Sequence, residues 1–237
     1  MDTVTNNIPE NYDPSAFARP SVTVDVVIFA LVAEDLQALL IKRKHSPFAG
    51  MWAIPGGFVR INESLEEAAA RELAEETNVR NVYMEQLYTF GQPDRDPRTR
   101  VITVVYVALV PYDAIDHHPG DDAAETGWFS MFNLPDLAFD HREILDYALT
   151  RLRYKLEYTA VGFELLPDEF TLSDLQKAYE IILHESLDKR NFRRKILSAN
   201  ILEETGRMKS LGEGRPAKLY RYQQNAIAEI KTRRLFP

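Results

Sequence analysis

The sequence predicts an α/β or α+β sandwich followed by a smaller domain built mostly of helices. Up to about residue 140, short segments rich in β-branched and aromatic residues alternate with helical patterns, as in a sheet covered by helices. Beyond that point, two further helical patterns and a basic segment with turn glycines follow one another closely. The order of these patterns therefore indicates two domains of different architecture.

The composition is that of a soluble globular protein. The chain has 237 residues, of which 45% are hydrophobic and 27% charged. Its longest apolar runs last about ten residues, against the roughly 20 that a membrane span needs. The first residues lack the basic and apolar regions of a secretory signal. The absence of cysteine excludes disulfides and thiolate metal sites and is compatible with a reducing cytoplasm, where we expect the protein.

The charge is divided unevenly along the chain. The formal net charge of -8 hides a net -13 over residues 1–150 and a net +5 over residues 151–237. An acidic domain repels polyanions unless a metal ion or a focused local field intervenes, whereas a basic domain attracts them. The two parts are therefore expected to face different partners.

The first part of the chain contains an arm and four strand patterns. Residues 1–20 show no periodicity and hold three prolines, so we expect an extended arm. Segments rich in β-branched and aromatic residues predict strands at residues 22–32, 38–43, 101–110 and 127–131.

Two helices are expected in the same part. Ser64 and Glu67 form a capping-box pattern, which predicts a helix from Ser64 to Thr77 with an apolar stripe of Leu65, Ala68, Ala69 and Leu73. A second capping signature, Asp140 with Glu143, begins a helix that runs through about Tyr154. Its apolar face is Ile144, Leu145, Ala148 and Leu152, and we expect it to join the two halves.

Residues 56–79, GGFVRINESLEEAAARELAEETNV, gather carboxylates on one helix. At this spacing Glu72 and Glu76 lie one turn apart, Glu75 lies beside them, and Arg71 is close enough to orient one of them. Such a cluster repels itself unless a cation fills it, and hard oxygen ligands favour Mg²⁺ or Mn²⁺. These ions also bind phosphate oxygens and activate water for attack on a pyrophosphate. The alternative reading is a solvated acidic face.

The same segment resembles the Nudix box, a pattern of Gly, five residues, Glu, seven residues, then Arg-Glu-apolar-x-Glu-Glu-x-Gly-apolar. Eight positions match in type and spacing: Gly57, Glu63, Arg71, Glu72, Leu73, Glu75, Glu76 and Val79. Asn78 replaces the late glycine, and asparagine is the next-best residue for the left-handed turn that ends a helix. The resemblance implies a Nudix α/β/α sandwich, with Glu72, Glu75 and Glu76 as metal ligands and, where hydrolysis occurs, as catalytic groups.

The resemblance also implies an effector pocket around the box. Gly56 and Gly57 let the backbone approach the ligand closely. The expected pocket further includes the basic position 42 (Lys42, followed by Arg43), Trp52, Arg71, Phe90, Arg95 and Arg100. Two alternatives stay open here, because Trp52 either stacks on a base or fills the core, and the loop arginines either contact ligand or are surface charge.

A dense basic cluster marks the second domain. Five of the seven residues from Lys189 to Lys195 are basic, and Asp188 is a good N-cap for a helix that begins there. Phe192, Ile196 and Ala199 share its apolar face, and the remaining positions are Lys189, Arg190, Asn191, Arg193, Arg194 and Lys195. A solvated surface helix is the alternative.

The segment GEGRPAKLYRY downstream resembles the β-wing of a winged helix-turn-helix, with Arg215 and Lys218 among its basic residues. Basic side chains near the start of a helix suit the DNA major groove, and wing residues neutralise phosphates. The two motifs together therefore favour a DNA-binding domain.

Taken together, the two parts resemble the Nudix-related transcriptional regulators of bacteria. The likeness covers the box and four further segments, FDHREILDYAL, FTLSDLQKAYE, LDKRNFRRK and GRPAKLYRY. It implies three parts, namely an arm (1–20), a Nudix effector-binding domain with the connector helix (21–155) and a winged helix-turn-helix domain (156–237).

In that family the first domain senses ADP-ribose or related NAD metabolites, and the second binds operator DNA, usually as a repressing homodimer. We therefore expect a repressor of NAD biosynthesis or salvage genes that ADP-ribose releases from double-stranded operator DNA, with Mg²⁺ or Mn²⁺ as cofactor. Three alternatives stay open: a Mg²⁺-dependent Nudix pyrophosphatase acting on ADP-ribose-like nucleoside diphosphate sugars, a sugar-responsive regulator of the same family, and an RNA-processing Nudix protein.

Overall fold

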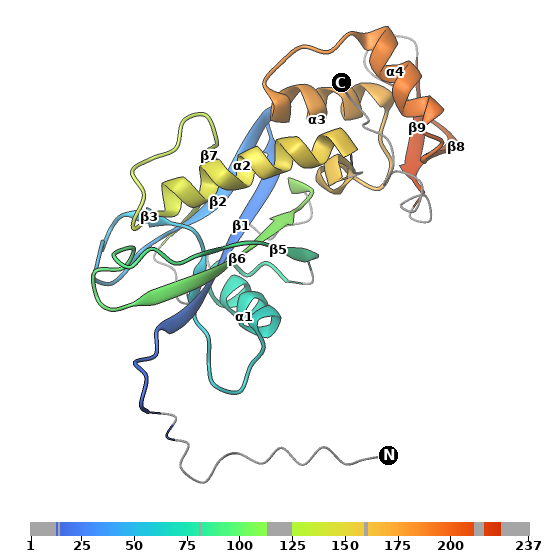
Figure 1. Ribbon diagram of the computed structural model, residues 1–237. Coiled ribbons are helices and arrows are strands. Elements are labelled where there is room, and N and C mark those ends of the chain that lie inside the picture. The colour runs from blue at the N-terminus through green and yellow to red at the C-terminus, as the bar shows by residue number, and fades with distance from the viewer. Residues whose placement is uncertain are drawn as a thin grey trace, which may run out of the picture.

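The computed structural model describes residues 13, 15–80, 82–112, 125–158, 161–210 and 216–223. Figure 1 shows a twisted sheet with helices packed against it and, beyond the end of helix α2, a smaller unit of helices and a two-stranded sheet. Most of the predicted arm, residues 1–20, lies outside the described ranges, as does Arg215. Within those ranges, no helix combines the length and the apolar character that crossing a bilayer requires.

The main sheet is mixed, and its central strand is β1. Its strands are β1 (Ser21–Val32), β2 (Asp35–Lys42), β3 (Trp52–Ala53), β4 (Gly56–Phe58), β5 (Met84–Phe90), β6 (Val101–Leu109) and β7 (Thr126–Ser130). Strand β1 pairs in parallel with β6 and antiparallel with β2 and β4. The four predicted strands are confirmed. The sequence missed β3 and β4, which are only two and three residues long, and β5, an edge strand with mostly part-exposed residues.

The sheet lies between two helices, α1 (Leu65–Thr77) and α2 (His141–Tyr158). Successive side chains of a strand point to opposite faces, so each apolar run serves two cores. Val24, Val26 and Ile28 of β1 belong to the cluster that includes α1. Val27 and Phe29 belong to the cluster that includes α2. The predicted α/β/α sandwich is therefore confirmed.

Helix α1 begins and ends as its sequence predicts. The Ser64 hydroxyl accepts a hydrogen bond from the Glu67 backbone, and the Glu67 carboxylate accepts one from the Ser64 backbone, at 3.1 and 2.7 Å. Asn78 ends the helix with φ of 59° and donates its backbone N–H to Ala74. Asparagine therefore adopts the left-handed conformation that glycine has in the Nudix pattern.

Helix α2 continues to Tyr158, four residues beyond the predicted end. Its predicted apolar face is buried, since Ile144, Leu145, Ala148 and Leu152 all belong to the core. Asp140 precedes the helix, but its carboxylate accepts two hydrogen bonds from Arg95. The start of α2 is therefore attached to the preceding domain by a charged pair.

The smaller unit contains the predicted helix-turn-helix and wing. Its elements are the 3-10 helix η2 (Val161–Leu165), α3 (Leu172–Leu183), α4 (Lys189–Ser198), β8 (Leu202–Lys209) and β9 (Ala217–Tyr222). The Asp188 carboxylate accepts a hydrogen bond of 2.7 Å from the Asn191 backbone, which confirms the predicted N-cap of α4. Strand β8 was not predicted, because LEETGRMK lacks an alternating apolar pattern.

The two domains share one hydrophobic core. A single cluster runs from Val27 and Phe29 of β1 through Leu152 and Leu156 of α2 to residues of the winged helix. The winged-helix members include Phe163, Phe170, Leu175, Tyr179, Ile182, Phe192 and Ile196. Polar contacts add to it, since Lys177 of α3 pairs with Glu34 and the Arg153 Nε donates to the Ile182 carbonyl at 2.8 Å.

This shared core predicts a single unfolding transition. Both tryptophans, Trp52 and Trp128, lie in the Nudix-like sheet, whereas far-UV circular dichroism reports helices of both domains. In urea the two signals should change together. Leu152→Ala should lower the free energy of unfolding by about 2–5 kcal/mol and keep the signals coincident. The exposed neighbour Arg151 provides the control, because Arg151→Ala should change stability by less than about 0.5 kcal/mol. Two separated transitions would contradict a common core.

Candidate functional site

Arg71 of α1 collects three of the box carboxylates. Its guanidinium donates to both Glu63 oxygens at 2.9 and 2.6 Å, to Glu72 at 2.7 Å and to Glu75 at 3.1 Å. The hydrogen bonds from Arg71 lower the pKa of Glu63 to about 2. The three carboxylates therefore converge on one arginine, which holds them in fixed positions.

Glu76 occupies a different environment on the same helix. The Gly56 backbone N–H donates to its carboxylate at 2.8 Å, and burial raises its pKa to about 8. Burial also raises the pKa of Glu72. A side chain at Gly57 would place its Cβ 2.3 Å from a Glu72 oxygen, so glycine lets strand β4 lie directly on the carboxylates.

A buried ionic network links this region to the start of α2. Arg95 donates to both oxygens of Asp140 at 2.8 and 2.6 Å, and it lies 3.8 Å from Asp25 of β1. Burial raises the pKa of Asp25 to about 6, although Thr103 donates a hydrogen bond of 2.6 Å to it. His141 accepts a hydrogen bond from the Ile54 backbone, and burial lowers its pKa to about 3, so the imidazole is neutral.

The other residues predicted to bind the effector do not lie together in the structure. Lys42 forms an ion pair of 3.1 Å with Glu125, and its ammonium lies 5.5 Å from the centre of the Trp52 ring. Trp52 packs edge-on against Phe129 and is only partly buried. Phe90 belongs to the core, and Arg100 is exposed and donates to backbone carbonyls of Gln92 and Val101. The geometry groups Gly56, Gly57 and Arg71 around the box and directs Arg95 to Asp140.

Sequence reasoning missed several members of this site. Asp25 had a usable signal, because it is the one carboxylate in an otherwise apolar strand. Arg43 lies next to the predicted position 42, and its guanidinium is 4.7 Å from the centre of the Phe139 ring. Asp140 and His141 had no local signal, since their partners Arg95 and Ile54 are 45 and 87 residues away in the chain.

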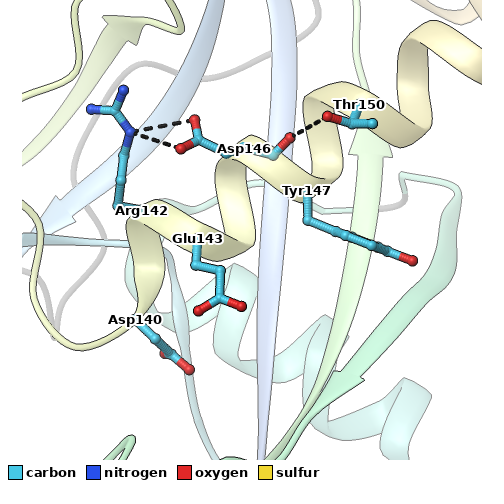
Figure 2. Close-up of a pocket in the computed structure, with 6 residues that line it drawn as sticks. All are labelled: Asp140, Arg142, Glu143, Asp146, Tyr147 and Thr150. Atoms are coloured by element: carbon cyan, nitrogen blue, oxygen red, sulfur yellow. Dashed lines mark hydrogen bonds and ion pairs between the residues drawn. The ribbon is translucent and has the colours of Figure 1, made fainter.

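The outer side of α2 carries a separate polar surface. Figure 2 shows Asp140, Arg142, Glu143, Asp146, Tyr147 and Thr150 around a shallow pocket of about 640 Å³. Arg142 pairs with Asp146 one turn later at 3.1 Å, and the Asp146 carbonyl accepts a hydrogen bond from Thr150. Arg142 and Asp146 are therefore paired with each other and Asp140 is bound by Arg95, whereas the box lies on the opposite side of the sheet.

Helix α4 presents its basic residues unequally. Phe192 and Ile196 are buried, and Phe192 packs edge-on against Tyr179 of α3. Lys189, Arg190 and Arg194 are exposed, and Arg194 donates to the Asn191 side chain at 2.7 Å. Arg193 is part-buried and donates to the Ser173 hydroxyl at 3.1 Å, and Lys195 is also part-buried. On the wing, Lys218 pairs with Glu204 at 2.8 Å.

Two family models cover most of the chain. Residues 22–148 match the NUDIX domain, and residues 162–222 match the NrtR DNA-binding winged helix domain. The chain is 40% identical over 215 residues to the ADPR responsive transcriptional repressor of Acinetobacter baylyi. The match covers 89% of this chain and 85% of that protein. The chain belongs to the family of Nudix-related transcriptional regulators.

Two solved structures of this family are similar to the chain. The crystal structure of Shewanella oneidensis NrtR complexed with a 27mer DNA is 36% identical, covers 90% of this chain and 96% of that chain, and gives a TM-score of 0.77. The NUDIX domain of the same regulator complexed with ADP ribose is 40% identical, covers 60% and 94%, and gives a TM-score of 0.53. The likeness to the first structure therefore extends over both domains.

Nudix domains generally use divalent metal ions. In this regulator the donor chemistry fits such an ion, because Glu72 and Glu76 are part-buried oxygen donors whose ionisation a cation would favour. Their arrangement is not a finished ligand set. Within the described ranges, no three acidic or histidine side chains are placed to hold a metal together, and Arg71 binds Glu72 and Glu75 instead.

The raised pKa of Glu76 predicts a pH-dependent stability in metal-free buffer. The group ionises near 4.5 in the unfolded chain and near 8 in the folded protein. Between these values the folded protein holds the proton more tightly, so Glu76 lowers stability progressively as pH rises. Glu76→Gln should therefore match the wild type near pH 4 and exceed it by up to about 4–5 kcal/mol near pH 9.

Urea unfolding at a series of pH values measures this difference. The matched control is Glu143→Gln, which removes an exposed glutamate from α2. If the difference in the free energy of unfolding between Glu76→Gln and the wild type stays constant with pH, burial does not raise the pKa of Glu76.

Proposed function

We propose that this regulator is a transcriptional repressor whose winged-helix domain binds double-stranded operator DNA and whose Nudix domain binds ADP-ribose, which releases the DNA. The observation that carries the proposal is the joining of a Nudix box and a basic recognition helix through one hydrophobic core. The repressor name of the Acinetobacter relative and the DNA and ADP-ribose complexes of the Shewanella regulator support it.

The DNA-binding side rests on the exposed charge of α4. Lys189, Arg190 and Arg194 lie on the first turns of the helix. There arginine can reach guanine edges, and both lysine and arginine can neutralise phosphates. The proposed DNA-binding set also contains Asn191, Arg193, Lys195, Arg215 and Lys218. Binding to phosphates releases counterions, so affinity falls steeply with salt.

The effector side rests on the box and its surroundings. The proposed ligand set is Lys42, Trp52, Gly56, Gly57, Arg71, Phe90, Arg95 and Arg100. When a divalent cation is present, Glu72, Glu75 and Glu76 are proposed to hold it, and it supplies positive charge for the diphosphate of the ligand. We further propose a cytoplasmic homodimer that represses NAD biosynthesis or salvage genes, since a two-fold protein suits a palindromic operator.

Release requires that ADP-ribose favour a different arrangement from the one that DNA favours. The network from Glu76 past Asp25 and Arg95 to Asp140 leads from the box to the first turn of α2. Helix α2 in turn shares its core with α3. A change in the pocket can therefore alter the position of the DNA-binding domain through these contacts.

Fluorescence anisotropy with promoter fragments tests the proposal. A preferred fragment should bind tightly, and ADP-ribose should weaken that binding by about 5- to 150-fold. A Nudix pyrophosphatase, which the nearly complete box favours as the second candidate, would cleave ADP-ribose rapidly with Mg²⁺ and bind DNA without selectivity. Glu76→Gln separates the two, because lost turnover with intact ADP-ribose control of DNA binding shows that hydrolysis is dispensable.

A further inference from the structure

Residues 169–174, which end the loop after η2 and form the first turn of α3, contact both strands of the wing. The Glu169 carboxylate accepts hydrogen bonds from Arg207 of β8 and from Arg221 of β9, the second at 3.1 Å. Phe170 and Tyr220 exchange two backbone hydrogen bonds of 3.0 and 2.8 Å, so the segment pairs with β9 as a short additional strand. The wing is therefore attached to this segment by main chain and side chains.

The same segment contacts the recognition helix. The Arg193 guanidinium of α4 donates to the Ser173 hydroxyl at 3.1 Å, and among the described residues its buried Nε has no hydrogen-bond partner. Asp174 pairs with Lys209 of β8 at 3.3 Å and also forms the capping box of α3 with Thr171. Residues 169–174 therefore connect the start of α3 to α4 and to both wing strands.

The charges in these contacts oppose simple attraction to DNA. Glu169 is 15% exposed, whereas its partners Arg207 and Arg221 are 67% and 54% exposed. A carboxylate there lowers the positive potential that a polyanion needs. Likewise, Arg193 is directed to Ser173, while Lys189, Arg190 and Arg194 are exposed. Such contacts fix the position of the wing and of α4 and do not raise the affinity of the domain for DNA.

We propose that residues 169–174 form a positioning segment that fixes the wing relative to α4. Arg193 then serves the proposed DNA-binding set by holding α4 against Ser173 and not by contacting DNA. Glu169 and Arg193 govern selectivity between operator and other duplexes, whereas Lys189, Arg190 and Arg194 contact the DNA. The inference rests on the proposed DNA-binding function. A rigid relation between helix and wing matters for selectivity because base contacts require one register, whereas phosphate attraction tolerates many.

Two quantities test this role on the full-length protein: the ratio of dissociation constants for a scrambled duplex and the preferred duplex, and the slope of log affinity against log salt. Glu169→Gln should tighten binding to the scrambled duplex and lower the selectivity ratio about tenfold. Arg193→Met should also lower the ratio about tenfold and leave the slope unchanged. Ser173→Ala, which removes only the acceptor of Arg193, should lower the ratio in the same direction.

The matched control is Glu203→Gln, because Glu203 is an exposed carboxylate on β8. It removes the same charge and should leave the selectivity ratio unchanged. Circular dichroism melting verifies that each variant is folded, and Ser173→Ala serves where Arg193→Met does not fold.

Two results would overturn the positioning role. In the first, Arg193→Met reduces the salt slope by about one and weakens both duplexes equally, as the loss of a phosphate contact does. In the second, Glu169→Gln leaves selectivity intact or Glu203→Gln lowers it equally. If the wild-type protein prefers no duplex at all, the proposed function itself fails, and this outcome is seen before any variant is compared.

Discussion

One apolar face of helix α2 belongs to both domains, and the arrangement of the protein depends on it. Leu145, Leu152 and Leu156 pack in a single cluster with β1 on one side and with α3 on the other. Protein interiors are closely packed, so a displacement of such a helix has to be accommodated on both sides. Because the described residues of the winged helix pack in this same cluster, its position is linked to that of the Nudix domain. Figure 1 shows α2 running from the sheet toward α3.

We propose that the glutamates of the box make the connection between the two domains responsive to a ligand. Arg71 binds three carboxylates on one side of α1, while the part-buried position of Glu76 raises its pKa and makes its ionisation unfavourable. A diphosphate or a cation placed beside such groups changes their electrostatic energy far more than it would in water. Asp25 and Arg95 lie between this region and Asp140, and we propose that the change reaches the first turn of α2 through these contacts.

Local sequence signals were sufficient for the elements that local interactions stabilise. The capping residues Ser64 and Asp188 place the starts of α1 and α4, and the β-branched and aromatic content of residues 22–32 gives the central strand. The Nudix spacing likewise gives Glu63, Arg71 and Glu72, because these residues contact one another within one loop and helix.

Contacts between distant segments carried no comparable signal. Strand β5 has few buried residues, so its pattern is weak although β6 pairs with it. Arg95 stays in the proposed ligand set, but its contact with Asp140, 45 residues later, had no local signal. Arg193 belongs to a basic run, yet its hydrogen bond to Ser173 follows only from how α3 and α4 pack together.

The central claim is that the two binding events oppose each other through the protein, and linkage makes such an effect reciprocal. Isothermal titration of ADP-ribose into the free protein and into the protein saturated with operator DNA measures it most directly. The account predicts a weaker ADP-ribose affinity in the DNA complex, by the same factor by which ADP-ribose weakens DNA binding. Equal ADP-ribose affinities in the two titrations would contradict it.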